Sequence, residues 1–181
     1  MDKVTYNGLT FKPYLTREEI ANQVRRVAEE IRRDYADENP LFLCVLNGAA
    51  IFAVDLFREC CIKQSEISFI RFKSYEGTLT TGTVKQIMGL DEDIEGRTVI
   101  VVEDIVDTGF TAKQLIKALA EKKPKEVKIA SLLFKPESLQ TEVKPDYVGF
   151  SIPSKFIIGY GLDIDGQARN LCDIFVLSED K

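Results

Sequence analysis

The stretch VIVVEDIVDTGFTA, residues 99–112, joins a wholly apolar run to a polar turn. Four β-branched residues in succession are typical of a strand that is covered on both faces, as in a parallel sheet. Two adjacent acids, Glu103 and Asp104, follow this run. An ionised carboxylate is costly to bury without a partner. The pattern therefore indicates a strand that leads into a polar site, where the acids meet cations or hydroxyl groups.

The turn after the acids predicts an anion site. Residues 107–111 read DTGFT, and a helix is expected to start within them, over residues 110–122. The free amide N–H groups of a first helical turn bind anions, and Gly109 lets the backbone approach a ligand closely. A phosphate monoester fits such a turn better than a neutral group does. The residues expected to bind it are Asp107, Thr108, Gly109, Phe110 and Thr111.

The acids beside this turn suggest a ribose. Carboxylates accept hydrogen bonds from vicinal hydroxyl groups, so Glu103 and Asp104 suit the 2′ and 3′ positions of a ribose 5-phosphate. Asp107, at the edge of the turn, is placed to move a proton near the anomeric carbon. An ordinary helix-capping turn is the alternative, but paired acids and Thr-Gly-x-Thr on one junction favour a site. No GxxxxGK[ST] or GxGxxG motif occurs, so a P-loop is unsupported.

The rest of the chain predicts an α/β fold. Apolar runs that predict strands occupy residues 41–46, 67–75, 84–88, 98–104 and 127–134. A helix is expected between the capping box Thr16–Glu19 and Pro40, and further helices over residues 49–60 and 110–122. Strands that alternate with helices are typical of a mostly parallel sheet flanked by helices. The runs 67–75 and 84–88 are expected to form a long hairpin around a Gly/Thr-rich loop.

The last quarter of the chain has a different character. Three prolines separate short apolar segments that have no helical period, at residues 146–152, 155–162 and 173–178. They predict a small, mostly β subdomain, the hood, over about residues 136–181 with part of the N-terminus. The core would then span about residues 16–135, and all 181 residues would form one domain.

Composition argues against several classes of protein. The net charge is −5, with 24 Lys+Arg against 29 Asp+Glu, so nucleic acid is not an expected partner. No apolar run approaches the roughly 20 residues that span a bilayer, and the start resembles no signal peptide, so we expect a cytoplasmic protein without membrane contact. The absence of histidine excludes His-based triads and argues against zinc. Reduced and mostly buried thiols are expected at Cys44, Cys60, Cys61 and Cys172.

The acids and the Thr-Gly turn after an apolar strand resemble the signature of the type I phosphoribosyltransferases. Further segments follow the order and spacing seen in the hypoxanthine-guanine branch, over roughly residues 40–178: VLNGAAIF, RFKSY, VEDIVDTGFT, ASLLFK, PDYVGFSIPSKFIIGYGLD and ARNL. The resemblance implies a twisted, mostly parallel sheet with a hood. It also implies transfer of ribose 5-phosphate from phosphoribosyl pyrophosphate to hypoxanthine, guanine or xanthine, with Mg²⁺, giving the nucleotide and pyrophosphate.

The resemblance also implies roles for single residues. Asp107 would take the proton from the attacking purine, and Glu103 and Asp104 would hold the ribose hydroxyls. The implied purine-binding residues are Lys135, Phe156, Ile157 and Asp163, of which Lys135 donates to the 6-oxo group and Phe156 stacks on the base. The implied metal-binding residues are Asp163, Glu103 and Asp104.

Two loops complete the site that the resemblance implies. Pyrophosphate would contact Leu46, Asn47, Gly48 and Arg169, with a cis peptide expected at Leu46–Asn47. Ser74 and Tyr75 would begin a flexible lid. Many relatives carry Lys in place of Asn47, and Lys or Arg in place of Phe110. Both departures remove positive charge, so donor binding would depend more on Mg²⁺ and Arg169.

Two other functions stay open at the level of sequence. A regulatory protein could keep the phosphoribosyl site and bind RNA or DNA, although the acidic balance opposes this. A transferase for another base, chiefly xanthine, or for a pyrimidine is the other. Lys135 with Phe156 and Ile157 favours a 6-oxopurine, and the choice among hypoxanthine, guanine and xanthine stays open. Relatives form dimers or tetramers, so a homodimer or homotetramer is expected.

Overall fold

A six-stranded sheet forms the centre of the molecule, in the order β5-β4-β3-β6-β7-β8. The computed structural model describes residues 2–73, 85–88 and 90–178. The strands are β3 (Leu41–Leu46), β4 (Glu66–Lys73), β5 (Lys85–Met88), β6 (Thr98–Val106), β7 (Glu126–Phe134) and β8 (Tyr147–Ser151). All neighbouring pairs are parallel except β4 and β5, which form the expected antiparallel hairpin.

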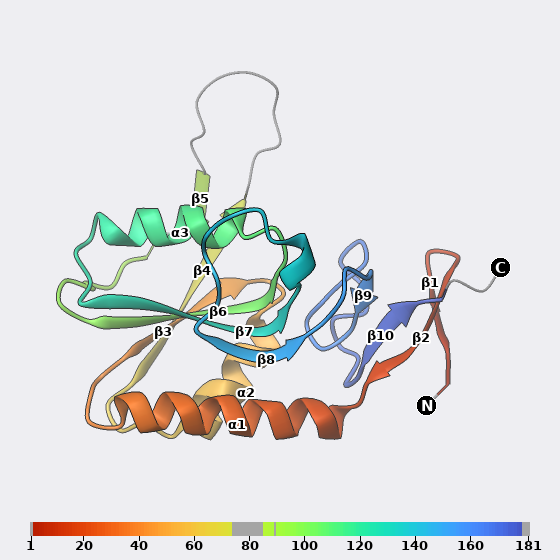
Figure 1. Cartoon of the computed structure of the whole chain (residues 1–181), viewed down its shortest axis with the longest axis horizontal. Helices are drawn as coiled ribbons and strands as arrows, with labels where there is room; N and C mark the ends of the chain where they lie inside the picture. Colours follow the sequence, from red (N-terminus) through yellow and green to blue (C-terminus); the bar gives the residue numbers. More distant parts are fainter. Residues whose placement is uncertain (1, 74–84, 89, 179–181) are drawn as a thin grey trace, which may run out of the picture.

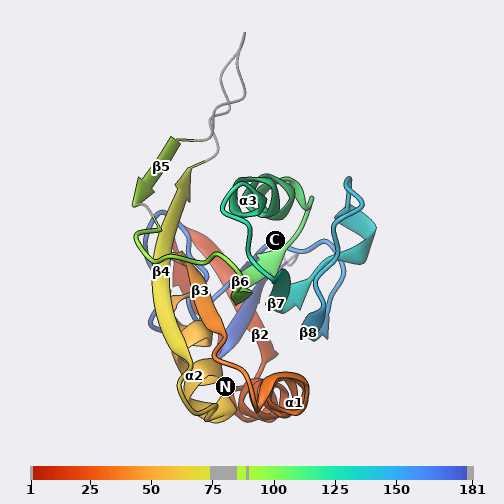
Figure 2. The same cartoon turned by 90° about the vertical axis from the view of Figure 1, so that its left-hand side faces the viewer.

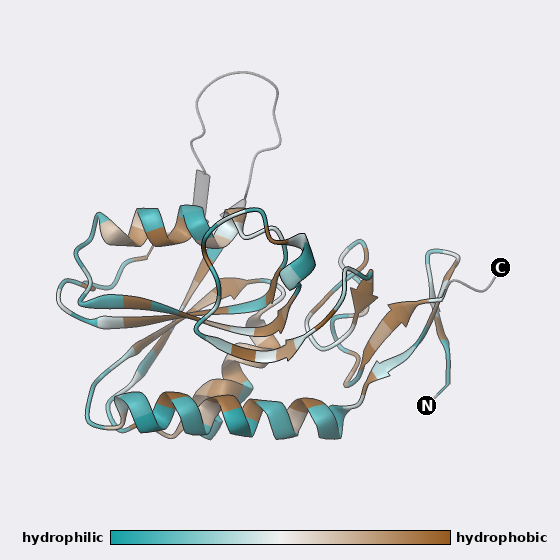
Figure 3. Ribbon diagram, viewed as in Figure 1, coloured by the Kyte–Doolittle hydropathy of each residue, from teal (hydrophilic) through white to brown (hydrophobic). Residues whose placement is uncertain are grey.

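Helices cover both faces of this sheet (Figure 2). Helices α1 (Arg17–Tyr35) and α2 (Ala50–Cys60) lie on one face, and α3 (Phe110–Ala120) lies on the other. Thr16 and Glu19 form the expected capping box at the start of α1. The buried residues of α1 recur every three or four positions, so one side packs on the sheet while the hydrophilic side faces outward (Figure 3). The predicted helices are confirmed: the ends of α2 and α3 differ from the predicted ones by at most two residues, and α1 ends at Tyr35, before the expected limit at Pro40.

The connections of two neighbouring strands fix where a ligand can bind. Strands β3 and β6 pair directly, but β3 continues into α2 on one face and β6 continues into α3 on the opposite face. In open α/β sheets, ligands usually bind at the carboxyl ends of two strands whose loops leave toward opposite faces, and we call this expected ligand position the crevice. The crevice therefore lies between the Leu46–Gly48 loop and the turn of residues 107–111.

A small antiparallel sheet forms the hood beyond the carboxyl ends of the parallel strands (Figure 1). Its order is β1 (Val4–Tyr6), β2 (Leu9–Leu15), β10 (Ile174–Leu177) and β9 (Ile157–Ile158). Phe11 and Ile158 are fully buried in its own apolar cluster. Both ends of the chain contribute to the hood, which confirms the expected share of the N-terminus.

One predicted boundary of the hood is wrong. The sequence pattern assigns residues 146–152 to the hood, but β8 pairs in parallel with β7 and forms an edge of the main sheet. The connection between these strands contains only one short 3₁₀ helix, Pro136–Ser138, so it lacks the helical pattern that marks most parallel crossovers. Arg26 of α1 donates to the carbonyl oxygens of Val148 and Gly149, which covers part of the exposed edge.

Two expectations from the sequence composition, on membrane-spanning helices and on cysteine burial, can be compared with the structure. Within the described ranges, each helix is too short or too polar to cross a membrane. All four cysteines are free, but Cys61 and Cys172 are exposed, so the prediction of mostly buried thiols is correct only for Cys44 and Cys60. Cys61 is exposed because it lies just past the end of α2, in a left-handed conformation with φ of 49°.

Candidate active site

The paired acids lie inside β6, which extends two residues beyond the predicted strand end at residue 104. The strand continues to Val106, because Ile105 and Val106 still pair with β7. Glu103 is only 6% exposed. Burial, and secondarily the charge of Asp104, raise the pKa of Glu103 well above its usual range. Burial also raises the pKa of Asp104 to about 6, although the Ile105 amide, 2.9 Å from Oδ1, opposes the shift. Both carboxylates would gain from a ligand that brings hydroxyl donors or positive charge.

This burial predicts that Asp104 destabilises the ligand-free protein at neutral pH. A carboxyl with a raised pKa contributes stability while protonated, and that contribution is lost as pH rises through about 6. Asp104→Asn should therefore raise the free energy of unfolding by on the order of 2 kcal/mol at about pH 7.5 and by little at about pH 4. The amide oxygen of Asn can still accept from Ile105. Urea denaturation at the two pH values measures the difference.

The exposed Asp37 offers a matched control for this experiment. Asp37→Asn removes one negative charge from the surface and should change stability by only a few tenths of a kcal/mol at either pH. A gain for Asp104→Asn that is the same at both pH values would contradict the prediction, because it would show that ionisation of Asp104 is not the cause.

Three chain segments meet tightly at the Leu46–Gly48 loop. A Cβ atom on Gly48 would overlap the carboxylate of Asp104, and a Cβ atom on Gly161 would overlap the carbonyl oxygen of Gly48. Gly161 also has φ of +100°, which disfavours other residues. The predicted cis peptide at Leu46–Asn47 is present. The loop is thus held between β6 and a hood segment, and Gly161 is a contributor that the sequence analysis missed.

Arg169 and Asp163 pair with each other in this hood segment. Arg169 Nη2 lies 2.6 Å from Asp163 Oδ1, and Nη1 donates to the Gly161 carbonyl oxygen at 2.6 Å. The second oxygen of Asp163 accepts from the Gly166 amide at 2.7 Å. The guanidinium is therefore oriented next to the Leu46–Gly48 loop, where the sequence predicts pyrophosphate to bind.

The turn of residues 107–111 has the features of an anion site. Gly109 has φ of +82° and is the N-cap residue of α3, and no side chain caps the helix there. The N–H groups of the first turn are thus available to a ligand. Phe110 is 51% exposed, so it adds an apolar surface beside the turn.

Lys135 forms an ion pair with Asp107 that the sequence did not predict. Lys135 follows β7, its side chain is 10% exposed, and Nζ lies 3.0 Å from Asp107 Oδ2. Its backbone amide donates to the Val106 carbonyl oxygen at 3.0 Å. The two residues are 28 positions apart in sequence, and the pairing follows from the parallel contact of β6 with β7.

The remaining predicted residues lie in the hood or outside the described residues. Phe156 is 48% exposed and contacts the Phe11 ring, with centroids 5.9 Å apart. Ile157 begins β9 and is buried. Asn47 is exposed at the tip of its loop. Ser74 and Tyr75, the predicted start of the lid, fall outside the residues that the structure describes.

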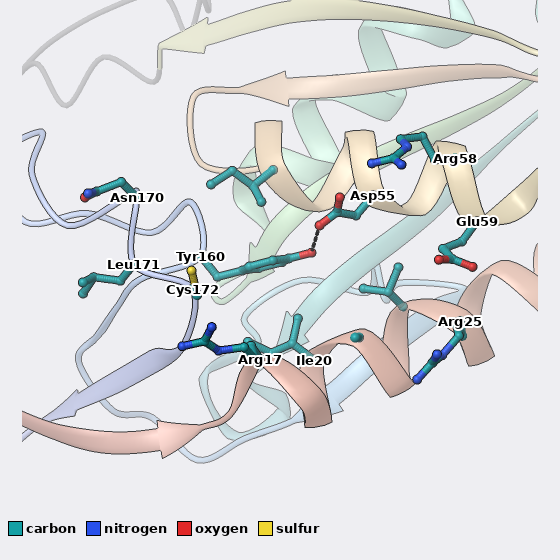
Figure 4. Close-up of a pocket in the computed structure, with 13 residues that line it drawn as sticks. Arg17, Ile20, Arg25, Asp55, Arg58, Glu59, Tyr160, Asn170, Leu171 and Cys172 are labelled. Carbon is teal, nitrogen blue, oxygen red and sulfur yellow. Dashed lines mark hydrogen bonds between the residues drawn. The ribbon is translucent and has the colours of Figure 1, made fainter. Parts of the chain in front are cut away.

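A cavity of about 680 Å³ lies apart from these residues, between α1, α2 and the hood segment that follows β9 (Figure 4). Tyr160 donates to Asp55 across it at 2.7 Å, and Arg17 and Arg58 stand at its walls. None of the predicted site residues lines it. The cavity is therefore separate from the carboxyl ends of β3 and β6, where Glu103, Asp104 and the turn of residues 107–111 lie.

Comparison with known proteins shows the family of the chain. Residues 12–165 match the phosphoribosyl transferase domain family. The hypoxanthine-guanine phosphoribosyltransferase of Streptococcus thermophilus is 39% identical over 170 residues, which cover 93% of this chain and 94% of that protein. The corresponding protein of Bacillus subtilis is 38% identical over 167 residues, 92% of each chain.

Solved structures show the same relationship. The crystal structure of a hypoxanthine-guanine phosphoribosyltransferase from Bacillus anthracis superposes with a TM-score of 0.86 at 38% identity, over 92% of this chain and 96% of that one. A hypoxanthine phosphoribosyltransferase from Staphylococcus aureus gives a TM-score of 0.87 at 34% identity, over 92% and 91%. The chain therefore belongs to the phosphoribosyltransferase family, in the branch of the hypoxanthine-guanine phosphoribosyltransferases.

Proposed function

We propose that this protein transfers ribose 5-phosphate from phosphoribosyl pyrophosphate to hypoxanthine or guanine, forming IMP or GMP and pyrophosphate in purine salvage. The observation that carries the proposal is the single β6–α3 junction, which holds one buried and one half-buried acid and an uncapped helix N-terminus. A ribose 5-phosphate needs acceptors for its hydroxyls and donors for its phosphate, in that order along one molecule.

The donor substrate would lie along the crevice. Glu103 and Asp104 would accept from the ribose hydroxyls, and the amides of residues 107–111 would hold the 5′-phosphate. The Leu46–Gly48 loop and Arg169 would hold the pyrophosphate, because both border the crevice from the opposite side. Fixed donors around a leaving anion stabilise the charge that develops as the glycosidic bond breaks.

The base would meet the ion pair of Lys135 and Asp107. The 6-oxo group and N7 of a purine share one edge, so a donor and an acceptor 3.0 Å apart suit that edge. Lys135 would donate to the oxygen, and Asp107 would take the proton from the imidazole ring as the base becomes a nucleotide. Adenine carries an amino group at this position and leaves the Lys135 ammonium without an acceptor. Phe156 and Ile157 of the hood would contact the ring.

Magnesium fits this site only together with the substrate. The described residues contain no group of three or more His, Cys, Asp or Glu placed to hold an ion. Mg²⁺ is commonly held by one or two carboxylates with phosphate oxygens and waters, so Asp163, Glu103 or Asp104 could supply the protein ligands. When bound, it would neutralise charge on the pyrophosphate. Asp163 would then exchange part of its contact with Arg169 for the ion.

The test is a panel of bases. The protein is incubated with phosphoribosyl pyrophosphate, Mg²⁺ and one base at a time, and nucleotide is separated by chromatography. Hypoxanthine and guanine should react and adenine should not, because adenine offers no 6-oxo acceptor to Lys135. The rate with xanthine shows how far contacts at the opposite edge of the base distinguish xanthine from hypoxanthine and guanine. No nucleotide from either hypoxanthine or guanine would contradict the proposed function.

We also infer a cytoplasmic homodimer or homotetramer that forms a single domain per chain and takes neither nucleic acid nor membrane as partner. A solved relative from Trypanosoma cruzi, with a TM-score of 0.87, was studied for the role of its C-terminal region in oligomeric state and activity. The lid that would begin at Ser74 and Tyr75 stays a prediction.

A further inference from the structure

The segment that follows β7 runs along the outer side of the phosphate turn. Its first residue, Lys135, donates hydrogen bonds to Val106 of β6 and to Asp107 of the turn. Five residues later, the Gln140 amide donates to the Thr108 carbonyl oxygen at 3.0 Å. One short stretch of chain is therefore attached to the turn at three successive positions.

Two side chains of this segment contact Gly109 itself. A Cβ atom on Gly109 would overlap Thr141 Oγ1 and would lie 2.8 Å from Leu139 Cδ1. Thr141 Oγ1 accepts from the Val143 amide at 3.4 Å, and Leu139 and Val143 pack against the apolar core beneath α3. Leu139 and Thr141 thus form a supported wall behind the residue whose positive φ sets the direction of the first helical amides.

The wall matters because no side chain caps the N-terminus of α3. In many helices a capping hydroxyl or carboxylate fixes the first turn, but here the N–H groups must stay free for an anion. Their direction then depends on the conformation of Gly109, and a glycine has wide backbone freedom unless its neighbours restrict it. The Lys113–Glu142 ion pair is largely exposed and adds little restriction.

We propose that Leu139 and Thr141 are positioning residues for the 5′-phosphate. This inference rests on the proposed function. The two side chains hold Gly109 so that the amides of residues 108–111 point at the phosphate before it binds. Loss of the wall lets the turn sample other conformations and reduces phosphate affinity, while the base site and the proton transfer at Asp107 keep their geometry.

The side-chain test uses Thr141→Ala and Leu139→Ala. Each should raise KM for phosphoribosyl pyrophosphate about 10-fold, with kcat and KM for hypoxanthine changed less than about threefold. Thr141→Ser keeps the hydroxyl that contacts Gly109 and should restore most of the affinity. Glu142→Gln removes only the exposed ion pair and serves as the matched control, with no change. Thermal unfolding of each variant shows whether it is folded under assay conditions.

A second test changes a backbone contact of the same segment and leaves the side chains of Leu139 and Thr141 in place. Gln140→Pro removes the amide that donates to Thr108, and the preceding residue, Leu139, already has the extended conformation that proline favours, with φ of −65° and ψ of 126°. It should weaken IMP binding about 10-fold in calorimetry while inosine, which lacks the phosphate, binds as before. Gln140→Ala keeps the amide and should bind both ligands like the unchanged protein.

The outcomes distinguish this inference from the proposed function. If the unchanged protein forms no nucleotide, the proposed function fails. If it is active but Thr141→Ala, Leu139→Ala and Gln140→Pro leave KM for the donor and IMP affinity unaltered, the positioning role fails alone. Equal losses for IMP and inosine, or losses confined to kcat, would also overturn it, because a wall behind the phosphate turn acts only through the phosphate.

Discussion

Gly48→Ala should lower kcat/KM for phosphoribosyl pyrophosphate by a factor on the order of 10². The added methyl group would overlap the carboxylate of Asp104, so either the Leu46–Gly48 loop or the acid must move. Asp104 is half-buried within the paired strand β6, whereas the loop contains the exposed Asn47, so we expect the loop to move and to carry its proposed pyrophosphate contacts away. Steady-state kinetics with varied donor and saturating base measure the loss.

A double-mutant cycle shows whether this overlap is the cause. Gly48→Ala alone should destabilise the protein by about 1–3 kcal/mol, as overpacked interiors do. In an Asp104→Ala background the same change should destabilise it by much less, because the atoms that it would overlap are gone. Urea denaturation of the four proteins measures the coupling. An equal loss in both backgrounds would mean that the methyl group meets something other than Asp104.

The candidate site could be predicted from sequence where its residues are adjacent along the chain. Glu103, Asp104 and the turn of residues 107–111 stand on one strand–helix junction, and local chemistry is enough to predict acceptors followed by an anion site. The pattern of α1 was equally local, because its capping box and apolar period lie within the helix itself. Local patterns of this kind can be interpreted without any knowledge of tertiary contacts.

Contacts between distant segments could not be read in this way. The sequence around Lys135 does not predict that Asp107 is its partner, because only the parallel pairing of β7 with β6 brings the two residues together. Gly161 likewise meets Gly48 from a different subdomain. Strand β8 was misassigned because its crossover has no helical period, although parallel pairing needs only about a dozen connecting residues. Each of these features depends on the completed fold.

Asp107→Asn should lower the rate of a single turnover by a factor on the order of 10² or more, with donor affinity nearly unchanged. Asparagine is almost the same size and can still accept from Lys135, so the position of the ammonium is kept. It cannot take up the proton that the purine must lose. A single-turnover measurement is required, because product release limits the steady-state rate of many enzymes and would hide part of the effect.

The reverse reaction provides the internal control for this assignment. Formation of base and donor from IMP and pyrophosphate passes through the same transition state, so Asp107→Asn should slow both directions by the same factor. Asp165→Asn changes an exposed carboxylate of the hood that accepts from Asn7, and it should leave both rates unaltered. A loss that appears in donor affinity instead of rate would assign Asp107 to the phosphate site alone. An unchanged rate would mean that its ion pair with Lys135 serves only to orient the ammonium.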